Sequence, residues 1–144
     1  MKDFTARRTM MVDTQVRPSD VTKFPIIDAM LSVPREAFVP VGLREAAYVG
    51  ENLALGGGRV MIEARTLGKI LDGLMIEPNH VALDLGCGLG YSTAVLAQMC
   101  DFVVAVEDDD ARATIAQETL SEHGVDNAAV MTGPLAAGSA KSGP

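Results

Sequence analysis

The sequence predicts an α/β protein in which an N-terminal helical cap is followed by the first half of a doubly wound, mostly parallel sheet. Apolar residues recur at helical spacing in the first half of the chain. Two short, continuously apolar runs follow at 81–85 and 102–106, as is typical of buried parallel strands. A glycine-rich turn comes directly after the first run. We therefore expect a cap region at 1–76 and a partial sheet domain at 77–144.

The cap region is predicted to form short helices interrupted by prolines. Helical patterns of apolar residues cover 20–31 and 63–74. Pro34 and Pro40 break the chain between these patterns. The three consecutive glycines at 56–58 predict a flexible loop before the second helix.

Strands and helices alternate in the second region. The apolar run at 81–85 is followed by a predicted helix at 92–99 and the second run by a predicted helix at 108–122. The acidic first turn of the latter suits the positive end of a helix dipole. A third strand is predicted at 128–131. This alternation predicts a parallel sheet.

Composition excludes several classes of function. The 144 residues fit one domain with a real core, and the net charge of −7 with scattered basic residues disfavours nucleic acid as a partner. Cys87 and Cys100 fit neither a disulfide framework nor a metal site, so no metal is expected. No apolar run approaches the roughly 18 residues of a membrane span. The charged N-terminus does not resemble a signal peptide, so a cytoplasmic location is expected.

The turn at 84–90 is the motif that points to chemistry. Gly86, Gly88 and Gly90 let the backbone of this turn pass close under a ligand, because no Cβ stands in the way. Glu107 ends the next strand. A carboxylate there can accept hydrogen bonds from the ribose hydroxyls of an adenosine ligand. The alternative is that Glu107 only caps the helix that follows.

Glycine spacing separates two classes of adenosine ligand. A dinucleotide fingerprint requires G-x-G-x-x-G, but here the third glycine falls one place early, at Gly90, and the sixth position is Tyr91. Tyr91 therefore argues against an NAD-binding dehydrogenase. With Asp84 two residues before the first glycine, the pattern resembles the signature of class I S-adenosylmethionine methyltransferases. For Asp84, three roles stay open: orienting the loop, facing the amino group of the ligand, or capping the glycine turn.

Segments before and after this turn resemble one methyltransferase family, the protein-L-isoaspartate O-methyltransferases. The resemblance covers residues from about 10 to 138. It implies a Rossmann-like methyltransferase sheet, S-adenosyl-L-methionine as the methyl donor, and the carboxylate of an isoaspartyl residue in a damaged protein or peptide as the acceptor. The role implied is protein repair. The segments that carry the resemblance are 11–16, 28–40, 47–48, 83–97 and 104–107, and the most specific piece is 33–40.

Together, the turn and the resemblance give a set of candidate cofactor-binding residues. No catalytic side chain is assigned, because an acceptor carboxylate is already ionised at neutral pH. The candidate residues are Asp84, Gly86, Cys87, Gly88, Gly90, Tyr91, Glu107 and Asp108.

Departures from the family pattern keep three hypotheses open. Ile62 and Glu63 stand where the family usually has Ser-Gln, and Gly133–Leu135 replaces a Gly-Asp-Gly turn. The chain is also expected to be C-terminally truncated, which would leave the strand at 81–85 with an open apolar edge and favour self-association. The chain is then an isoaspartyl methyltransferase, a methyltransferase for another acceptor, or a non-catalytic S-adenosylmethionine-binding module.

Overall fold

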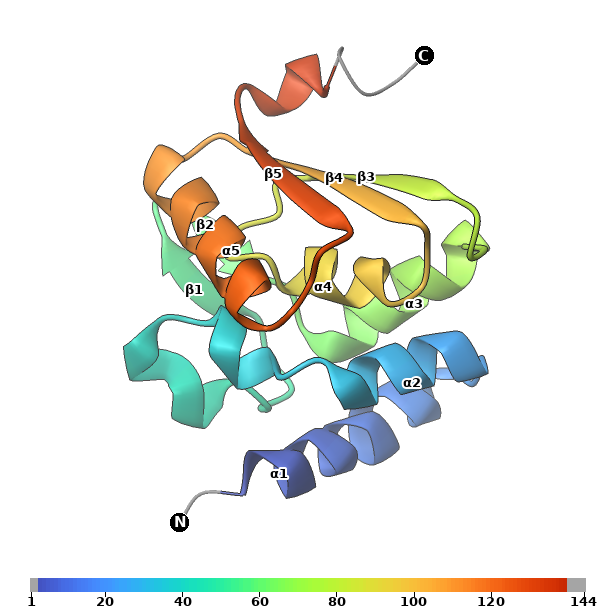
Figure 1. Ribbon diagram of the computed structural model, residues 1–144. Coiled ribbons are helices and arrows are strands. Elements are labelled where there is room, and N and C mark those ends of the chain that lie inside the picture. Colours follow the sequence, from blue (N-terminus) through green and yellow to red (C-terminus); the bar gives the residue numbers. More distant parts are fainter. Residues whose placement is uncertain (1–2, 140–144) are drawn as a thin grey trace. The chain divides into compact units, whose positions relative to one another are not determined.

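A computed structural model describes residues 3–139 of the chain (Figure 1). The chain divides into two compact units, Met1–Ile76 and Glu77–Pro144, which are described separately below. The predicted regions at 1–76 and 77–144 also include residues 1–2 and 140–144, which lie outside the described residues.

Helices dominate the first unit. The helical pattern predicted at 20–31 begins only at Phe24, because Asp20 adopts a left-handed conformation with φ of 66° and ends the preceding turn. The predicted helix at 63–74 begins at Ala64, and Glu63 takes the N-cap position. The elements are α1 (Phe4–Met11), a π-helical turn (Val12–Val16), a 3-10 turn (Arg17–Ser19), α2 (Phe24–Ser32), 3-10 turns at Arg35–Phe38 and Val41–Ala46, and α3 (Ala64–Leu74).

A hairpin replaces the flexible loop expected at the three glycines. β1 (Leu53–Gly56) pairs antiparallel with β2 (Arg59–Met61). The connecting residues Gly57 and Gly58 have φ of 60° and 76°. Positive φ at both central residues is the requirement of the two-residue turn that best matches strand twist. The glycines thus form the end of β1 and the turn of a hairpin, which the sequence analysis did not predict.

The second unit contains the predicted parallel sheet. Its three strands are hydrogen-bonded in the order β3-β4-β5, and both pairs are parallel. Figure 1 shows α4 and α5 on the same face of this sheet. The elements are β3 (Val81–Leu85), α4 (Tyr91–Ala97), β4 (Phe102–Glu107), α5 (Asp110–Glu122), β5 (Ala128–Thr132) and a 3-10 turn at Leu135–Ala137. The α/β class and the strand positions are confirmed.

One strand is less buried than the sequence predicts. β4 is central and largely buried, but within the described part of the sheet β3 pairs only with β4. Val81, Leu83 and Leu85 point to the face away from α4 and α5 and are 61%, 52% and 49% exposed. Among the described strands β3 thus lies at an edge of the sheet, as expected, whereas the expectation of a fully buried first strand was wrong.

Between residues 3 and 139, no helix is both long and apolar enough to cross a lipid bilayer.

Candidate cofactor site

The glycine turn is fastened to the end of the neighbouring strand. The backbone N–H groups of Gly86 and Cys87 both donate to the carbonyl of Val106, at 2.7 and 3.2 Å. Gly90 has φ of 101°, and a Cβ at this position would lie 3.4 Å from the Cβ of Ala116 on α5. Glycine is favoured here by the backbone conformation, whereas a Cβ would make only an ordinary van der Waals contact with α5.

Glu107 connects the glycine turn to the start of α5. Its side chain is fully buried. One carboxylate oxygen accepts a hydrogen bond from the N–H of Gly88 at 3.0 Å, and the other accepts from the N–H of Asp109 at 2.8 Å. The guanidinium of Arg112 lies 3.8 Å from the second oxygen. These donors compensate the buried negative charge, and they keep the carboxylate at the predicted turn.

Asp84 is held by two hydroxyl groups at the start of α4. Ser92 and Thr93 both donate to the same oxygen, Oδ2, at 2.7 and 2.8 Å. Thr93 is fully buried. The sequence analysis missed both hydroxyl residues, although the Ser-Thr pair directly after the turn was visible as a possible source of donors for Asp84.

The other candidate residues take different positions. Cys87 is buried and packs against Ala105, Ala116 and Val130, so its side chain belongs to the core of the second unit. Tyr91 begins α4 and is also buried. The side chain of Asp108 is exposed, and Asp109 rather than Asp108 caps α5.

Asp84, the glycines and Glu107 come together at the carboxyl ends of two adjacent parallel strands. Asp84 pairs with Ala105 in the sheet register, and Glu107 follows two residues later on β4. Residues two apart on a strand share a face, so Asp84 and Glu107 leave the sheet on the same face. Open parallel sheets bind ligands beyond the carboxyl ends of their strands. No described group of three or more His, Cys, Asp or Glu side chains is arranged to hold a metal ion.

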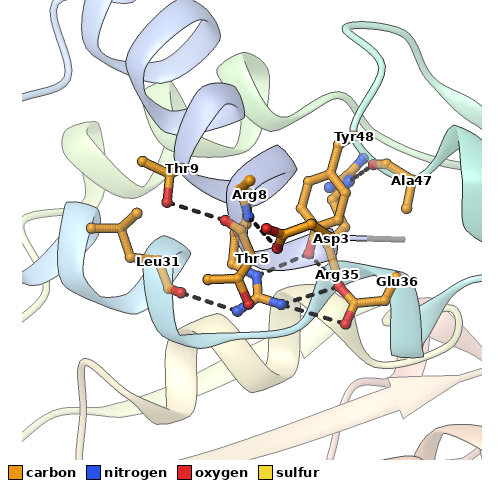
Figure 2. Close-up of polar contacts among 10 residues, drawn as sticks. Asp3, Thr5, Arg8, Thr9, Leu31, Arg35, Glu36, Ala47 and Tyr48 are labelled. Carbon is orange, nitrogen blue, oxygen red and sulfur yellow. Dashed lines mark hydrogen bonds and ion pairs between the residues drawn. The ribbon is translucent and has the colours of Figure 1, made fainter. Parts of the chain in front are cut away.

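A second polar cluster lies within the first unit and was not predicted (Figure 2). Arg8 donates to the hydroxyl of Tyr48 at 2.9 Å and to the carboxylate of Glu36 at 3.2 Å. The hydroxyl of Tyr48 in turn donates to Glu36. Burial, reinforced by the hydrogen bond to Glu36, raises the pKa of Tyr48 well above its ordinary value. No sequence motif connects these three residues, which lie far apart along the chain.

The segment that departs from the family pattern is fixed by its neighbours. A buried arginine, Arg35, donates to the carbonyls of Ala47 and Ile62 at 2.6 and 3.0 Å. The N–H of Glu63 donates to the side chain of Asn52 at 2.9 Å, and the carboxylate of Glu63 accepts from Thr66 at 3.0 Å. The backbone of this segment is therefore held in place before α3 begins.

Comparison with known proteins supports the resemblance seen in the sequence. The family described as protein-L-isoaspartate(D-aspartate) O-methyltransferase matches residues 7–144. A protein-L-isoaspartate O-methyltransferase of Methylorubrum extorquens is 35% identical over 123 residues, covering 85% of this chain and 54% of the relative. One of Syntrophus aciditrophicus is 32% identical over 133 residues, covering 92% and 61%. The chain thus spans a little over half the length of these curated relatives.

Solved structures share the fold. A protein-L-isoaspartate O-methyltransferase superposes with a TM-score of 0.82 at 21% identity, over 95% of this chain and 45% of the other. A putative enzyme of this kind from Plasmodium falciparum, in complex with S-adenosyl-L-homocysteine, gives 0.73 at 17% identity, over 92% and 64%. From the match over residues 7–144, the chain belongs to the protein-L-isoaspartate(D-aspartate) O-methyltransferase family.

Proposed function

We propose that this chain binds S-adenosyl-L-methionine and serves the transfer of its methyl group to the carboxylate of isoaspartyl residues in damaged proteins. The observation that carries the proposal is the contact between Glu107 and the N–H of Gly88, at 3.0 Å. This contact sets an acidic group beside a glycine turn, at the sheet edge where nucleotides bind in open α/β folds.

In this proposal, Glu107 grips the sugar of the cofactor. A carboxylate can accept about four hydrogen bonds. Its contacts with the N–H groups of Gly88 and Asp109 hold the carboxylate at the glycine turn, where a ribose hydroxyl would donate to it. The other predicted contacts come from the turn itself and from Asp84, Cys87, Tyr91 and Asp108.

The methyl transfer requires little general acid–base catalysis from the protein. The acceptor carboxylate is ionised at neutral pH. An oxygen of the acceptor forms a bond to the methyl carbon while the carbon–sulfur bond breaks, and the electron pair of that bond stays on sulfur. Positive sulfonium and negative carboxylate are both neutralised. Positioning and exclusion of water then supply most of the rate enhancement.

A second candidate function keeps the cofactor but changes the acceptor. Ile62 and Glu63 put an apolar and a negatively charged side chain where the family usually has serine and glutamine. A negative charge is unfavourable beside an anionic acceptor. A chain that binds the cofactor without turnover would instead be a binding module.

Cofactor binding is tested by calorimetry with S-adenosylhomocysteine on the wild-type chain, Glu107→Ala and Glu107→Gln. We expect binding by the wild type and a loss of roughly tenfold or more in Glu107→Ala, because hydrogen bonds to a charged group contribute about 1.5–3 kcal/mol. Glu107→Gln keeps one acceptor oxygen and should lose less. Circular dichroism of each variant controls for unfolding. Unchanged affinity in a folded Glu107→Ala chain would contradict the assignment.

Methyl acceptance is tested with an isoaspartyl peptide and its aspartyl twin of identical sequence. Methylation of the isoaspartyl peptide alone supports the proposal. Methylation of other acceptors but not of the isoaspartyl peptide supports the second candidate function. Cofactor binding without any turnover supports a non-catalytic binding module.

The proposal includes a cytoplasmic location and self-association of the chain. The observation behind self-association is that, among the described strands, β3 pairs only with β4, and that Leu83 at its centre is half exposed. Unpaired strand edges with exposed apolar side chains favour pairing with another chain.

A further inference from the structure

We propose that a second copy of this chain pairs with the outer edge of β3, antiparallel and centred on Leu83, and that Gln117 limits the assembly to a pair. The pairing rests on the proposed function, because it gives the self-association proposed there a partner and a register. β3 and β5 are the outer strands of the described sheet, with β4 between them (Figure 1). The two edges differ in what covers their backbone.

The backbone of β3 directs hydrogen-bonding groups outward at every second residue. The N–H of Gly86 donates to the carbonyl of Val106 on β4 at 2.7 Å. Because successive residues of a strand direct these groups to opposite sides, Val81, Leu83 and Leu85 direct theirs away from β4. Within the described part of the chain, no backbone hydrogen bond from another element reaches these three residues. This edge can therefore receive a strand.

The edge of β3 also lacks the features that usually prevent strand addition. Soluble proteins protect such edges with charged side chains, prolines or bulges. β3 contains no proline, and its register with β4 is continuous. Its one charged side chain, Asp84, is held by Ser92 and Thr93 of α4. β3 therefore presents apolar side chains and no charge to a second strand.

A side chain of α5 closes the opposite edge of the sheet. The N–H of Val130, the middle residue of β5, donates to Oε1 of Gln117 at 3.0 Å. The amide nitrogen of Gln117 donates in turn to the hydroxyl of Ser121 at 3.3 Å. An incoming strand would have to displace an acceptor that is already in place. Strand addition is therefore disfavoured at β5 and left open at β3.

This difference between the edges favours a closed pair over an open chain of copies. A twofold axis at Leu83 sets this residue opposite its own equivalent, and it sets Val81 opposite Leu85 of the second copy. Residues that direct their backbone groups outward then meet as hydrogen-bonded pairs. The joined sheet has the order β5-β4-β3-β3-β4-β5. Both of its outer strands are β5 with Gln117 in place, so the contact is self-complementary and the assembly closes.

Cysteine cross-linking of the full chain tests the register. Cα atoms of a hydrogen-bonded antiparallel pair lie about 5.5 Å apart, which a disulfide can span. With oxidised glutathione we expect Leu83→Cys to give a covalent dimer as its main product. Val81→Cys should give none above the wild-type background, because the two equivalents would lie about 13 Å apart along the strands. Combining Val81→Cys with Leu85→Cys should restore the cross-link.

Matched variants measure cross-linking by random collision. Ile115 on α5 is 48% exposed, close to the 52% of Leu83, so Ile115→Cys gives the collisional yield. Both native cysteines are buried, and the wild type measures their contribution. Equal yields from Leu83→Cys and Ile115→Cys would overturn the pairing. A Val81→Cys chain that cross-links as readily as Leu83→Cys would indicate parallel strands and overturn the proposed register.

Substitution of Gln117 tests why the assembly stops at a pair. Gln117→Ala removes the acceptor from the N–H of Val130, so β5 of one copy could pair with β3 of the next. Sedimentation velocity should then show species larger than a dimer, which the wild type and Gln117→Glu, with its remaining acceptor oxygen, should not form. Circular dichroism controls for folding, and Gln117→Met, of similar shape, carries the test if the alanine variant does not fold. A folded variant without the acceptor that stops at the dimer would overturn the role of Gln117.

The pairing and the proposed cofactor site fail on different results. A wild type that stays monomeric overturns the pairing and the proposed self-association, whereas binding of S-adenosylhomocysteine would still support the methyltransferase function. A chain that pairs as described but does not bind S-adenosylhomocysteine overturns the cofactor assignment and leaves the pairing intact.

Discussion

Tyr48 is a residue whose ionisation is coupled to the fold of the first unit. Its hydroxyl accepts from Arg8 and donates to Glu36 within a half-buried cluster (Figure 2). Burial disfavours the phenolate, and the hydrogen bond to Glu36 favours the neutral phenol. Both effects raise the pKa of Tyr48 above its ordinary value of 10.0.

This shift predicts a loss of stability at alkaline pH. Above about pH 10 the unfolded chain loses the Tyr48 proton while the folded chain keeps it, so unfolding releases a proton and is favoured as pH rises. Urea unfolding from pH 8 to 11 should show a steeper decline for the wild type than for Tyr48→Phe. The phenylalanine variant loses the hydrogen bonds and should be less stable at pH 8.

Cys100 provides an internal control for this comparison. Burial also raises the pKa of its thiol, and this contribution is common to both proteins. A decline of equal slope in wild type and Tyr48→Phe would therefore show that Tyr48 does not stay protonated in the folded chain.

Individual contacts were the part of the site least accessible to sequence analysis. The glycines and Glu107 could be predicted because their spacing follows from strand and turn geometry. The hydroxyl groups that hold Asp84 were missed because a Ser-Thr pair in a sequence does not indicate which acceptor its hydroxyl groups will contact. Likewise Arg35 and Glu36 are adjacent and oppositely charged, yet Arg35 binds backbone carbonyls and Glu36 binds Arg8.

Among the elements, α5 depends on one side chain for its start. Asp109 occupies the N-cap position and its carboxylate accepts from the N–H of Arg112 at 2.9 Å. Loss of such a cap costs about 1 kcal/mol. We expect Asp109→Ala to lower the free energy of unfolding by this amount in urea titration.

Asp109→Asn is the companion variant. Asparagine also caps helices well, so it should keep most of the stability that alanine loses. If alanine and asparagine were equally destabilising, the cap would not be the source of the effect.

Helices and strands were predicted well where the pattern of apolar residues in the sequence matches the burial of the element in the structure. The positions of β3, β4 and β5 could be predicted because a short, continuous apolar run between turn-forming residues is typical of a buried strand. The hairpin was missed because Gly56–Gly58 carries no strand pattern, and its two flanking strands are only four and three residues long. The burial of β3 was overestimated because its apolar run resembles that of the central strand β4, although β3 pairs with one described strand only.

For the whole molecule, the exposed side of β3 predicts concentration-dependent association. Sedimentation velocity of the wild type over a range of concentrations should show a growing larger species. Leu83→Lys should reduce it, because a charge on an edge strand opposes pairing. Ile115→Lys is the matched control: Ile115 on α5 is 48% exposed, close to the 52% of Leu83. A wild type that stays monomeric throughout would contradict this prediction.

Arg35 ties together parts of the first unit that are distant along the chain. Its guanidinium bridges the carbonyls of Ala47 and Ile62, the latter directly after β2. A lysine could not span both, since it offers a compact charge in place of a rigid planar fork. Detachment of the hairpin would break the bond between this buried guanidinium and the carbonyl of Ile62, and losing a hydrogen bond to a charged group costs about 1.5–3 kcal/mol, so the hairpin is anchored to the helical turns that hold Arg35.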